Sequence, residues 1–306
     1  MDDALAILDH YIFNTVYATY PFTTPSLSPY FSDPSNVVRQ STSLFVFVYI
    51  GAWAMYLSCA GLSYWFLFDH NLKKHPKFLK NQVQLELWTC FKNFHYLVLY
   101  TVPWFVGEVR GYSKLYERIE DHPWGWWYIP ISVVWFLVFT DWLIYWAHRF
   151  LHHPWVYPRV HKVHHMWKVP TPFASHAFNA LDGYMQSLPY HLFAFLFPLQ
   201  KYVYLILFVG VNIWTISIHD QLFISRNHII NSTAHHTIHH RDFNYNFGQY
   251  FTFWDWISGT YRDPLDELKF ADAVRKTGEY QWTRARLPKE VVERGDGTKD
   301  EEDKGA

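Results

Sequence analysis

Cysteine and charge are both scarce in this chain of 306 residues. Cys59 and Cys90 are too few for a zinc ribbon, an iron–sulfur cluster or a disulfide framework, and neither lies near the histidine motifs described below. The net charge of -1 gives no basic field that would attract nucleic acid. A glycine-rich nucleotide loop is also missing, and the acidic start Met1-Asp2-Asp3 lacks the basic region of a secretory signal. We therefore expect neither a nucleic-acid-binding protein nor a secreted one.

Aromatic residues, by contrast, make up 21% of the chain. Membrane proteins place Trp and Tyr at both membrane interfaces, so this content favours a membrane protein. The predicted membrane segments are 44–68, a shorter second span with its core at 96–106, 129–147 and 191–218. Pro198 and Lys201 interrupt the last segment, which predicts a hairpin or a kinked helix there. The sequence thus predicts an all-α integral membrane protein with about four transmembrane helices.

The orientation of these segments follows from a short basic loop. Lys73, Lys74, Lys77 and Lys80 come directly after the first apolar segment, and such loops lie on the cytosolic side. Alternating crossings then bring all histidine motifs to the cytosolic membrane face. The sequon at 231–233 would require the lumen, and we interpret it as unused.

We predict three regions along the chain. Residues 1–128 form an N-terminal segment with the first membrane helices, and 129–264 form a histidine-rich catalytic domain. Residues 265–306 form a polar tail that is disordered at its end, because its last part is charged and nearly free of large apolar residues.

Three histidine motifs carry the chemical signal. One is H-x3-H at 148–152, and two are H-x2-H-H, at 161–165 and 236–240. Residues three and four apart share one face of a helix, so we expect each motif to present its imidazoles to a single point. A zinc site takes three or four protein ligands, so eight histidines predict two metal ions. The predicted ligands are His148, His152, His161, His164, His165, His236, His239 and His240.

Two further histidines are candidate ligands. His176 follows the second motif, and His219 ends the fourth apolar segment, where a buried polar side chain is costly and usually functional. His235 adjoins the third motif but points to a different helical face from His239, so it is a weaker candidate.

Imidazole binds iron, copper, zinc and nickel, and a site beside a lipid phase that dissolves O₂ favours redox-active iron. Ligating histidines usually donate their second N–H to a carboxylate or carbonyl. Candidates for that role are Asp141, Asp182, Asp220, Asp242 and Asp255. Candidates for the wall of a substrate cleft are Phe173, Phe247, Tyr250 and Trp254. We expect no catalytic residue apart from the metal ligands.

The segments between the motifs resemble a known family. These segments are 169–178 (VPTPFASHAF) with Asp182-Gly183, 186–191 (QSLPYH), 243–250 (FNYNFGQY) and 254–262. Together with the histidine motifs they resemble the sterol C5-desaturase branch of the fatty acid hydroxylase superfamily. The resemblance is strong over 141–262 and weak in the N-terminal segment and the tail.

This resemblance implies a bundle of transmembrane helices topped by a cytosolic helical cap that holds two non-haem irons. It implies removal of one hydrogen each from C5 and C6 of a Δ7-sterol, with O₂ as co-substrate. Electrons would come from NAD(P)H through a reductase and cytochrome b5, in the endoplasmic reticulum membrane.

Several alternatives remain open at this point. A hydroxylase, a C4-methyl oxidase or a triterpenoid desaturase of the same superfamily would share the first hydrogen abstraction, and only the mass of the product separates them. A bis-histidine haem electron carrier would need histidine pairs within opposing membrane helices. A zinc-binding or transport protein would bind zinc and consume no O₂.

Overall fold

The computed structural model describes residues 1–223 and 227–265, and these are predominantly helical. Three short helices come first: α1 (Asp2–Leu8), α2 (Asn14–Tyr17) and α3 (Ser28–Phe31). Three long helices follow: α4 (Val37–Phe66), α5 (Gln82–Val109) and α6 (Tyr128–Leu151). The remaining α-helices are α7 (Ala180–Leu196), α8 (Lys201–Ser217), α9 (Thr233–Asp242) and α10 (Phe253–Ile257).

Shorter elements connect these helices. Strand β1 (Leu115–Tyr116) pairs in parallel with β2 (Leu199–Gln200), with Leu115 opposite Leu199. A π-helical turn spans Asp9–Phe13, and 3-10 helices span His70–Lys74, Ile119–Asp121, Gly125–Trp127, His164–Met166 and Pro172–His176.

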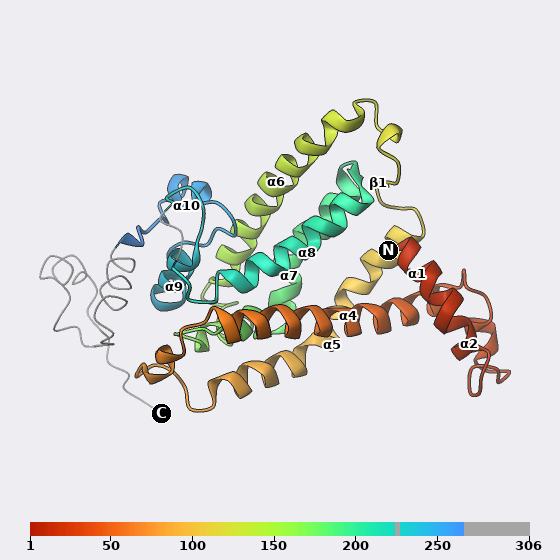
Figure 1. The fold of residues 1–306 in the computed structure, drawn as a ribbon, viewed down its shortest axis with the longest axis horizontal. Coiled ribbons are helices and arrows are strands. Elements are labelled where there is room, and N and C mark those ends of the chain that lie inside the picture. The colour runs from red at the N-terminus through yellow and green to blue at the C-terminus, as the bar shows by residue number, and fades with distance from the viewer. Residues whose placement is uncertain (224–226, 266–306) are drawn as a thin grey trace, which may run out of the picture.

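The long helices converge toward one end of the molecule (Figure 1). α4 packs along α5, and α6 packs along α7. The C-terminal ends of α6 and α8 reach the end at which α9 and α10 lie (Figure 1). The 3-10 helix Pro172–His176 contacts α4, α5 and α8, so the segment after the second histidine motif is held within this bundle. The fold thereby gathers the histidine motifs at a single end.

Capping side chains fix where the helices begin. The Asn36 side chain accepts the amide of Val38 at the start of α4, and Asn179 does the same for α7 through Leu181. Gln200 caps α8 directly after Pro198. The predicted fourth apolar segment is therefore two helices, α7 and α8, separated at the break that Pro198 and Lys201 predicted.

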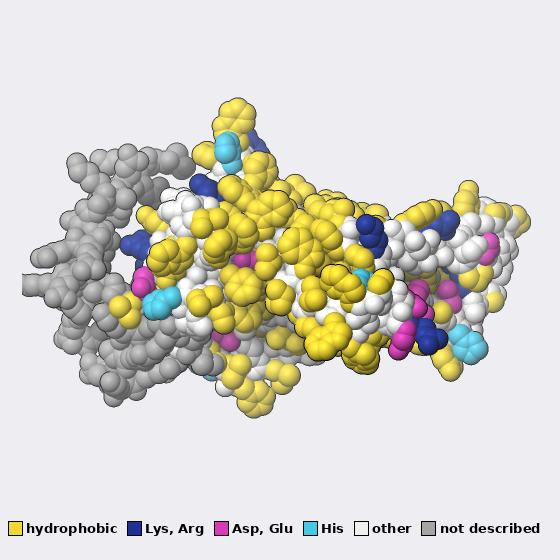
Figure 2. Space-filling model, turned by 90° about the horizontal axis from the view of Figure 1, so that it is seen from above, with side chains coloured by type: hydrophobic (Ala, Val, Ile, Leu, Met, Phe, Trp, Pro, Cys, Tyr) yellow, Lys and Arg dark blue, Asp and Glu magenta, His cyan; other side chains and the backbone are white. Residues whose placement is uncertain are grey.

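Two helical stretches are long and apolar enough to cross a membrane, Val37–Phe66 and Gly125–Leu151, with mean hydropathies of 1.7 and 1.6. Lys201–Ser217 is a shorter apolar helix. Hydrophobic side chains cover most of the middle of the molecule on the face shown in Figure 2, while charged side chains gather toward its ends. Such a surface is typical of a protein that lies in lipid, and the apolar helices associate this chain with a membrane. The number of crossings stays a prediction, as does the division of the chain at 128 and 264. Apart from residue 265, the predicted tail lies outside the described residues.

Candidate metal centre

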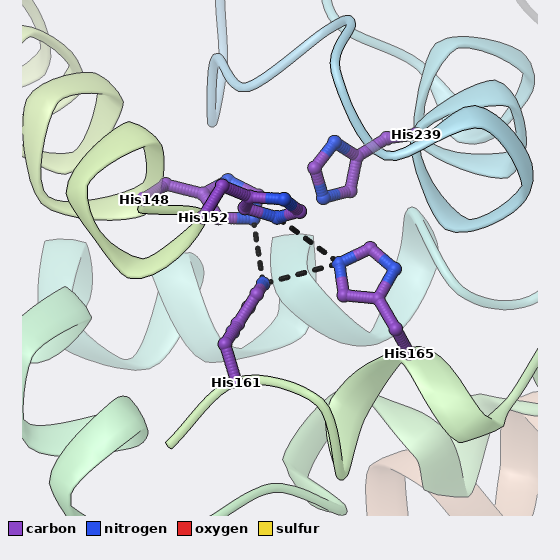
Figure 3. Close-up of side chains that lie close together, drawn as sticks. All are labelled: His148, His152, His161, His165 and His239. Atoms are coloured by element: carbon purple, nitrogen blue, oxygen red, sulfur yellow. Dashed lines mark hydrogen bonds between the residues drawn. The ribbon is translucent and has the colours of Figure 1, made fainter. Parts of the chain in front are cut away.

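Nine histidines, all buried except the partly exposed His152, lie in two groups, and within each group one ring nitrogen of every residue lies within 4.8 Å of the others. The first group is His148, His152, His161, His165 and His239 (Figure 3). The second group is His164, His219, His236 and His240. Each group has enough ligands for one metal ion, and the presence of two ions stays a prediction.

The two H-x2-H-H motifs are divided between the groups. His165 belongs to the first group and its neighbour His164 to the second, with their rings at 82° to one another. His239 and His240 are divided in the same way, at 86°. The expectation that each motif serves one point is therefore wrong for these two motifs and right for H-x3-H. Consecutive residues of an α-helix differ in direction by about 100°, which divides His239 and His240 on α9. Each of the two motifs therefore links both groups.

Four separate parts of the chain supply these side chains. His148 lies in the last turn of α6, and His152 follows that helix. The second motif lies in turns and the 3-10 helix His164–Met166 rather than in an α-helix. His219 follows α8, and α9 carries the third motif. The groups therefore form only where these elements meet.

Backbone carbonyls fix the protons of three of these imidazoles. His148 donates its Nδ1–H to the carbonyl of Phe247 at 3.0 Å, and His239 donates to Tyr245 at 2.8 Å. His219 donates in the same way to Thr215, at 2.7 Å. A carbonyl can only accept, so in each neutral ring the proton lies on Nδ1 and Nε2 carries a lone pair.

A carboxylate orients a fourth imidazole. Nδ1 of His161 lies 2.7 Å from Oδ2 of Asp182, and both side chains are fully buried. A histidine held by a carboxylate is a recurrent arrangement behind metal ligands, because it fixes the ring and raises the basicity of the other nitrogen. Asp182 was one of the predicted carboxylates.

The free nitrogens face one another at short distances. The Nε2 atoms of His148 and His161, both of which have their proton on Nδ1, are 3.2 Å apart. Nε2 of His219, which also carries a lone pair, lies 2.9 Å from Nε2 of His236. Two lone pairs that face each other repel and cannot form a hydrogen bond. A cation between His148 and His161 removes the repulsion, so the first group fits a metal ion and fits a purely structural role poorly. The second group directs the lone pair of His219 into a cluster of the same kind.

His176 lies outside both groups. Its Nε2 is 3.2 Å from Oδ1 of Asn212, whose amide nitrogen donates to the carbonyl of Phe208. Because that bond fixes the amide of Asn212, the proton of His176 lies on Nε2, and Nδ1 lies 3.0 Å from the hydroxyl of Ser175. No lone pair of His176 is directed at either group in this arrangement. His235 also belongs to neither group, and its Nδ1 accepts the amide of Ser232.

The other four candidate carboxylates do not contact a histidine of either group. Asp220 accepts the amide of Leu222, and Asp242 pairs with Arg241 and Arg262. Asp141 and Asp255 bind backbone amides of the segment 247–251. The carbonyls that orient the rings could not be predicted from the sequence, because every residue has a carbonyl.

Comparison with known proteins agrees with these motifs. The fatty acid hydroxylase family model matches residues 133–260. The chain is 53% identical to mouse lathosterol oxidase over 268 residues, which cover 86% of each chain. It is 50% identical to a Δ7-sterol 5(6)-desaturase of Schizosaccharomyces pombe over 277 residues, or 90% of this chain and 88% of that one. Human lathosterol oxidase is 49% identical over 86% of each chain.

The chain belongs to the fatty acid hydroxylase family. This confirms the resemblance carried by the histidine motifs and the segments between them. No solved structure shows significant similarity to the chain.

Burial sets the protonation state of this fatty acid hydroxylase centre. It lowers the pKa of His165, His236, His239 and His240 well below the usual range, and it lowers that of His219 to about 3. These rings are therefore neutral near pH 7, which is the state that metal ligation requires.

The same geometry argues against a bis-histidine haem carrier. A haem has two axial ligands on opposite faces of a porphyrin. In this family member the nitrogens converge from four or five side chains on one small volume, so a porphyrin does not fit between them.

Of the four predicted cleft aromatics, Phe247 lies against the centre, with its ring 5.0 Å from that of His152. Phe173 packs on Tyr64 at 5.3 Å, and Trp254 lies 6.4 Å from Trp142. Tyr250 lies 6.3 Å from Trp214. Aromatic contacts that the sequence did not single out are Phe243 against His165 at 4.8 Å and Phe178 against His164 at 6.0 Å.

Proposed function

We propose that this chain is a membrane-bound sterol C5-desaturase, which introduces a C5=C6 double bond into a Δ7-sterol with O₂. The observation that carries this proposal is the pair of buried histidine groups with inward lone pairs at the ends of apolar helices. The names of the relatives, lathosterol oxidase and Δ7-sterol 5(6)-desaturase, direct the choice of substrate within the family.

In this proposal the first group holds one iron and the second group holds another. When bound, the irons would supply the oxidising chemistry that couples O₂ reduction to removal of hydrogen from a C–H bond. The protein holds the imidazoles neutral and oriented. Phe247, Phe243 and Phe178 cover the histidines with apolar surface, which limits water and leaves a wall suited to sterol rings. Positioning one C–H bond correctly would be the protein's main contribution.

The electron balance requires an external donor. Reduction of O₂ to two waters takes four electrons and four protons, and desaturation of the sterol supplies two of each. The other two electrons would come from NAD(P)H through a reductase and cytochrome b5. The missing nucleotide loop of the sequence is consistent with this route.

We further propose four membrane crossings in the endoplasmic reticulum, with both histidine groups facing the cytosol. The basic loop after α4 lies at the end of α4 toward the histidine groups (Figure 1), and basic loops favour the cytosol. Asn231 of the sequon is buried, and its side chain donates to the carbonyl of Gly248, so this asparagine is not presented to a glycosylating enzyme.

Sterol profiling by mass spectrometry of cells that lack this protein tests the function. We expect Δ7-sterols without the C5 double bond to accumulate, and re-expression of the wild type to restore the 5,7-diene. The His164→Ala protein, expressed to the same level, should fail to restore it. A product that gains one oxygen would indicate a hydroxylase instead, and an unchanged sterol profile would refute the sterol substrate.

A further inference from the structure

The segment 247–251 is bound by two buried carboxylates, Asp255 and Asp141. Asp255 accepts the first two amides of the segment, at 2.9 and 2.8 Å, one on each of its oxygens. Asp141 accepts the next three amides on its Oδ1 atom, at 3.1, 2.6 and 3.4 Å. A buried charge is costly unless it is hydrogen-bonded. Two such carboxylates on five consecutive amides therefore indicate a segment whose position is strongly fixed.

This segment leads directly to the first histidine group. The carbonyl of Phe247 and the amide of Gly248 belong to one peptide unit, in which C=O and N–H point in opposite directions. The amide donates to Asp255, and the carbonyl accepts Nδ1–H of His148 at 3.0 Å. The orientation of His148 is therefore linked to Asp255 through a single peptide plane.

The close approach leaves no room at Gly248. A Cβ atom there would lie 2.3 Å from the carbonyl oxygen of Phe251 and 3.1 Å from Oδ2 of Asp255. Gly248 has an ordinary negative φ, so the space and not the backbone conformation requires glycine. The segment and the carboxylate are thus fitted to each other.

Asp255 is in turn tied to the helix that carries His148. Thr260 donates its hydroxyl proton to Oδ1 of Asp255 at 2.7 Å. Because that proton is used, the Tyr145 hydroxyl donates to Thr260, at 2.9 Å, and Arg149 donates to Tyr145 at 3.1 Å. Tyr145 and Arg149 flank His148 on α6.

We propose that Asp141 and Asp255 are positioning residues of the first histidine group: they fix the peptide between residues 247 and 248 so that its carbonyl holds His148 with Nε2 free for a metal. Neither carboxylate touches a histidine, so both act through the segment. This inference rests on the metal-binding part of the proposed function.

The two carboxylates differ in how many of their oxygens accept amides, so different substitutions are informative at each position. Both oxygens of Asp255 accept amides, so Asp255→Asn places an N–H₂ group against a backbone N–H. At Asp141 only Oδ1 accepts, and Oδ2 has no hydrogen-bond partner within 1–223 and 227–265. Asp141→Asn can keep the accepting oxygen, whereas Asp141→Ala cannot.

Metal binding by the full-length protein in nanodiscs tests the proposal, with Fe²⁺ titrated anaerobically and metal content measured by mass spectrometry. We expect two ions per wild-type chain. Asp255→Asn and Asp141→Ala should each lower the affinity for one of the two ions by about 10- to 100-fold. This is the range observed when groups that orient metal ligands are lost. Asp141→Asn should bind both ions as the wild type does.

Double variants show which ion is affected. Asp255→Asn combined with His152→Ala should retain one ion, because both substitutions affect the ion of the first group and leave that of the second group. Asp255→Asn combined with His236→Ala should retain one ion, bound about 10- to 100-fold more weakly than in the wild type. The proposal is overturned if Asp255→Asn binds both ions with wild-type affinity, or if the combination with His236→Ala still binds one tightly. If Asp255→Asn does not fold, equal binding by Asp141→Ala and Asp141→Asn overturns it. A wild type that binds no metal would refute the proposed centre itself.

Discussion

The Nε2 atoms of His148 and His161 lie 3.2 Å apart, although each ring has its proton fixed on the opposite nitrogen by a carbonyl or a carboxylate. Two facing lone pairs in a buried site are unfavourable. Bound metal should therefore stabilise the folded protein strongly, in proportion to the occupancy of the two groups.

Removal of metal by a chelator should lower the thermal unfolding midpoint, and Fe²⁺ or Co²⁺ should restore it. A free metal concentration of a hundred times the dissociation constant would add about 2.7 kcal/mol per site. Differential scanning fluorimetry in detergent measures the midpoint, with Mg²⁺ as the control because it prefers oxygen ligands. Equal midpoints with and without Fe²⁺ would contradict this expectation.

Replacement of the adjacent residues His164 and His165 should affect different ions. His164→Ala should lose the ion of the second group, and His165→Ala that of the first. His164→Ala with His236→Ala should therefore keep one ion, while His164→Ala with His165→Ala should keep none. Metal content per chain distinguishes these outcomes. Retention of one ion by the second pair would show that the two groups are not separate sites.

Asp182→Asn should weaken metal binding by about 10- to 100-fold, because it replaces the carboxylate that holds Nδ1–H of His161 with a weaker acceptor. Asp242→Asn is the matched control, since Asp242 pairs with Arg241 and Arg262 and contacts no histidine of the groups. Anaerobic Fe²⁺ titration measures both. Equal affinities in the two variants would argue against a role for Asp182 at the centre.

The metal-free protein should lose stability as the pH falls below about 6.5, the value for histidine in the unfolded chain. Burial lowers the folded-state pKa of His165, His236, His239 and His240. The unfolded chain therefore takes up protons first, and stability present above pH 6.5 is lost below it. Below pH 6.5 the free energy of unfolding should fall by about 1.4 kcal/mol per pH unit for each histidine that stays neutral in the folded protein. Unfolding midpoints at pH 7.5, 6.5 and 5.5 test this, and a midpoint that rises below pH 6.5 would contradict it.

The sequence by itself determined the helical class, the apolar segments, the break at Pro198 and the family. These features depend on local composition and on motifs within short stretches, which a sequence displays directly. The histidine spacing also indicated two metals, because eight imidazoles exceed the needs of one.

Only the tertiary structure decided how the histidines are shared. Neighbours such as His164 and His165 diverge because of the local backbone path, and His219 joins them because α8 ends beside α9. It also separated Asp182, which holds His161, from Asp141 and Asp255, which bind amides. A carboxylate's role depends on which donor faces it, and here the donors lie 21, about 110 and 8 residues away along the chain. The sequence does not show which of these separated residues face one another in space, so only the folded chain could assign these roles.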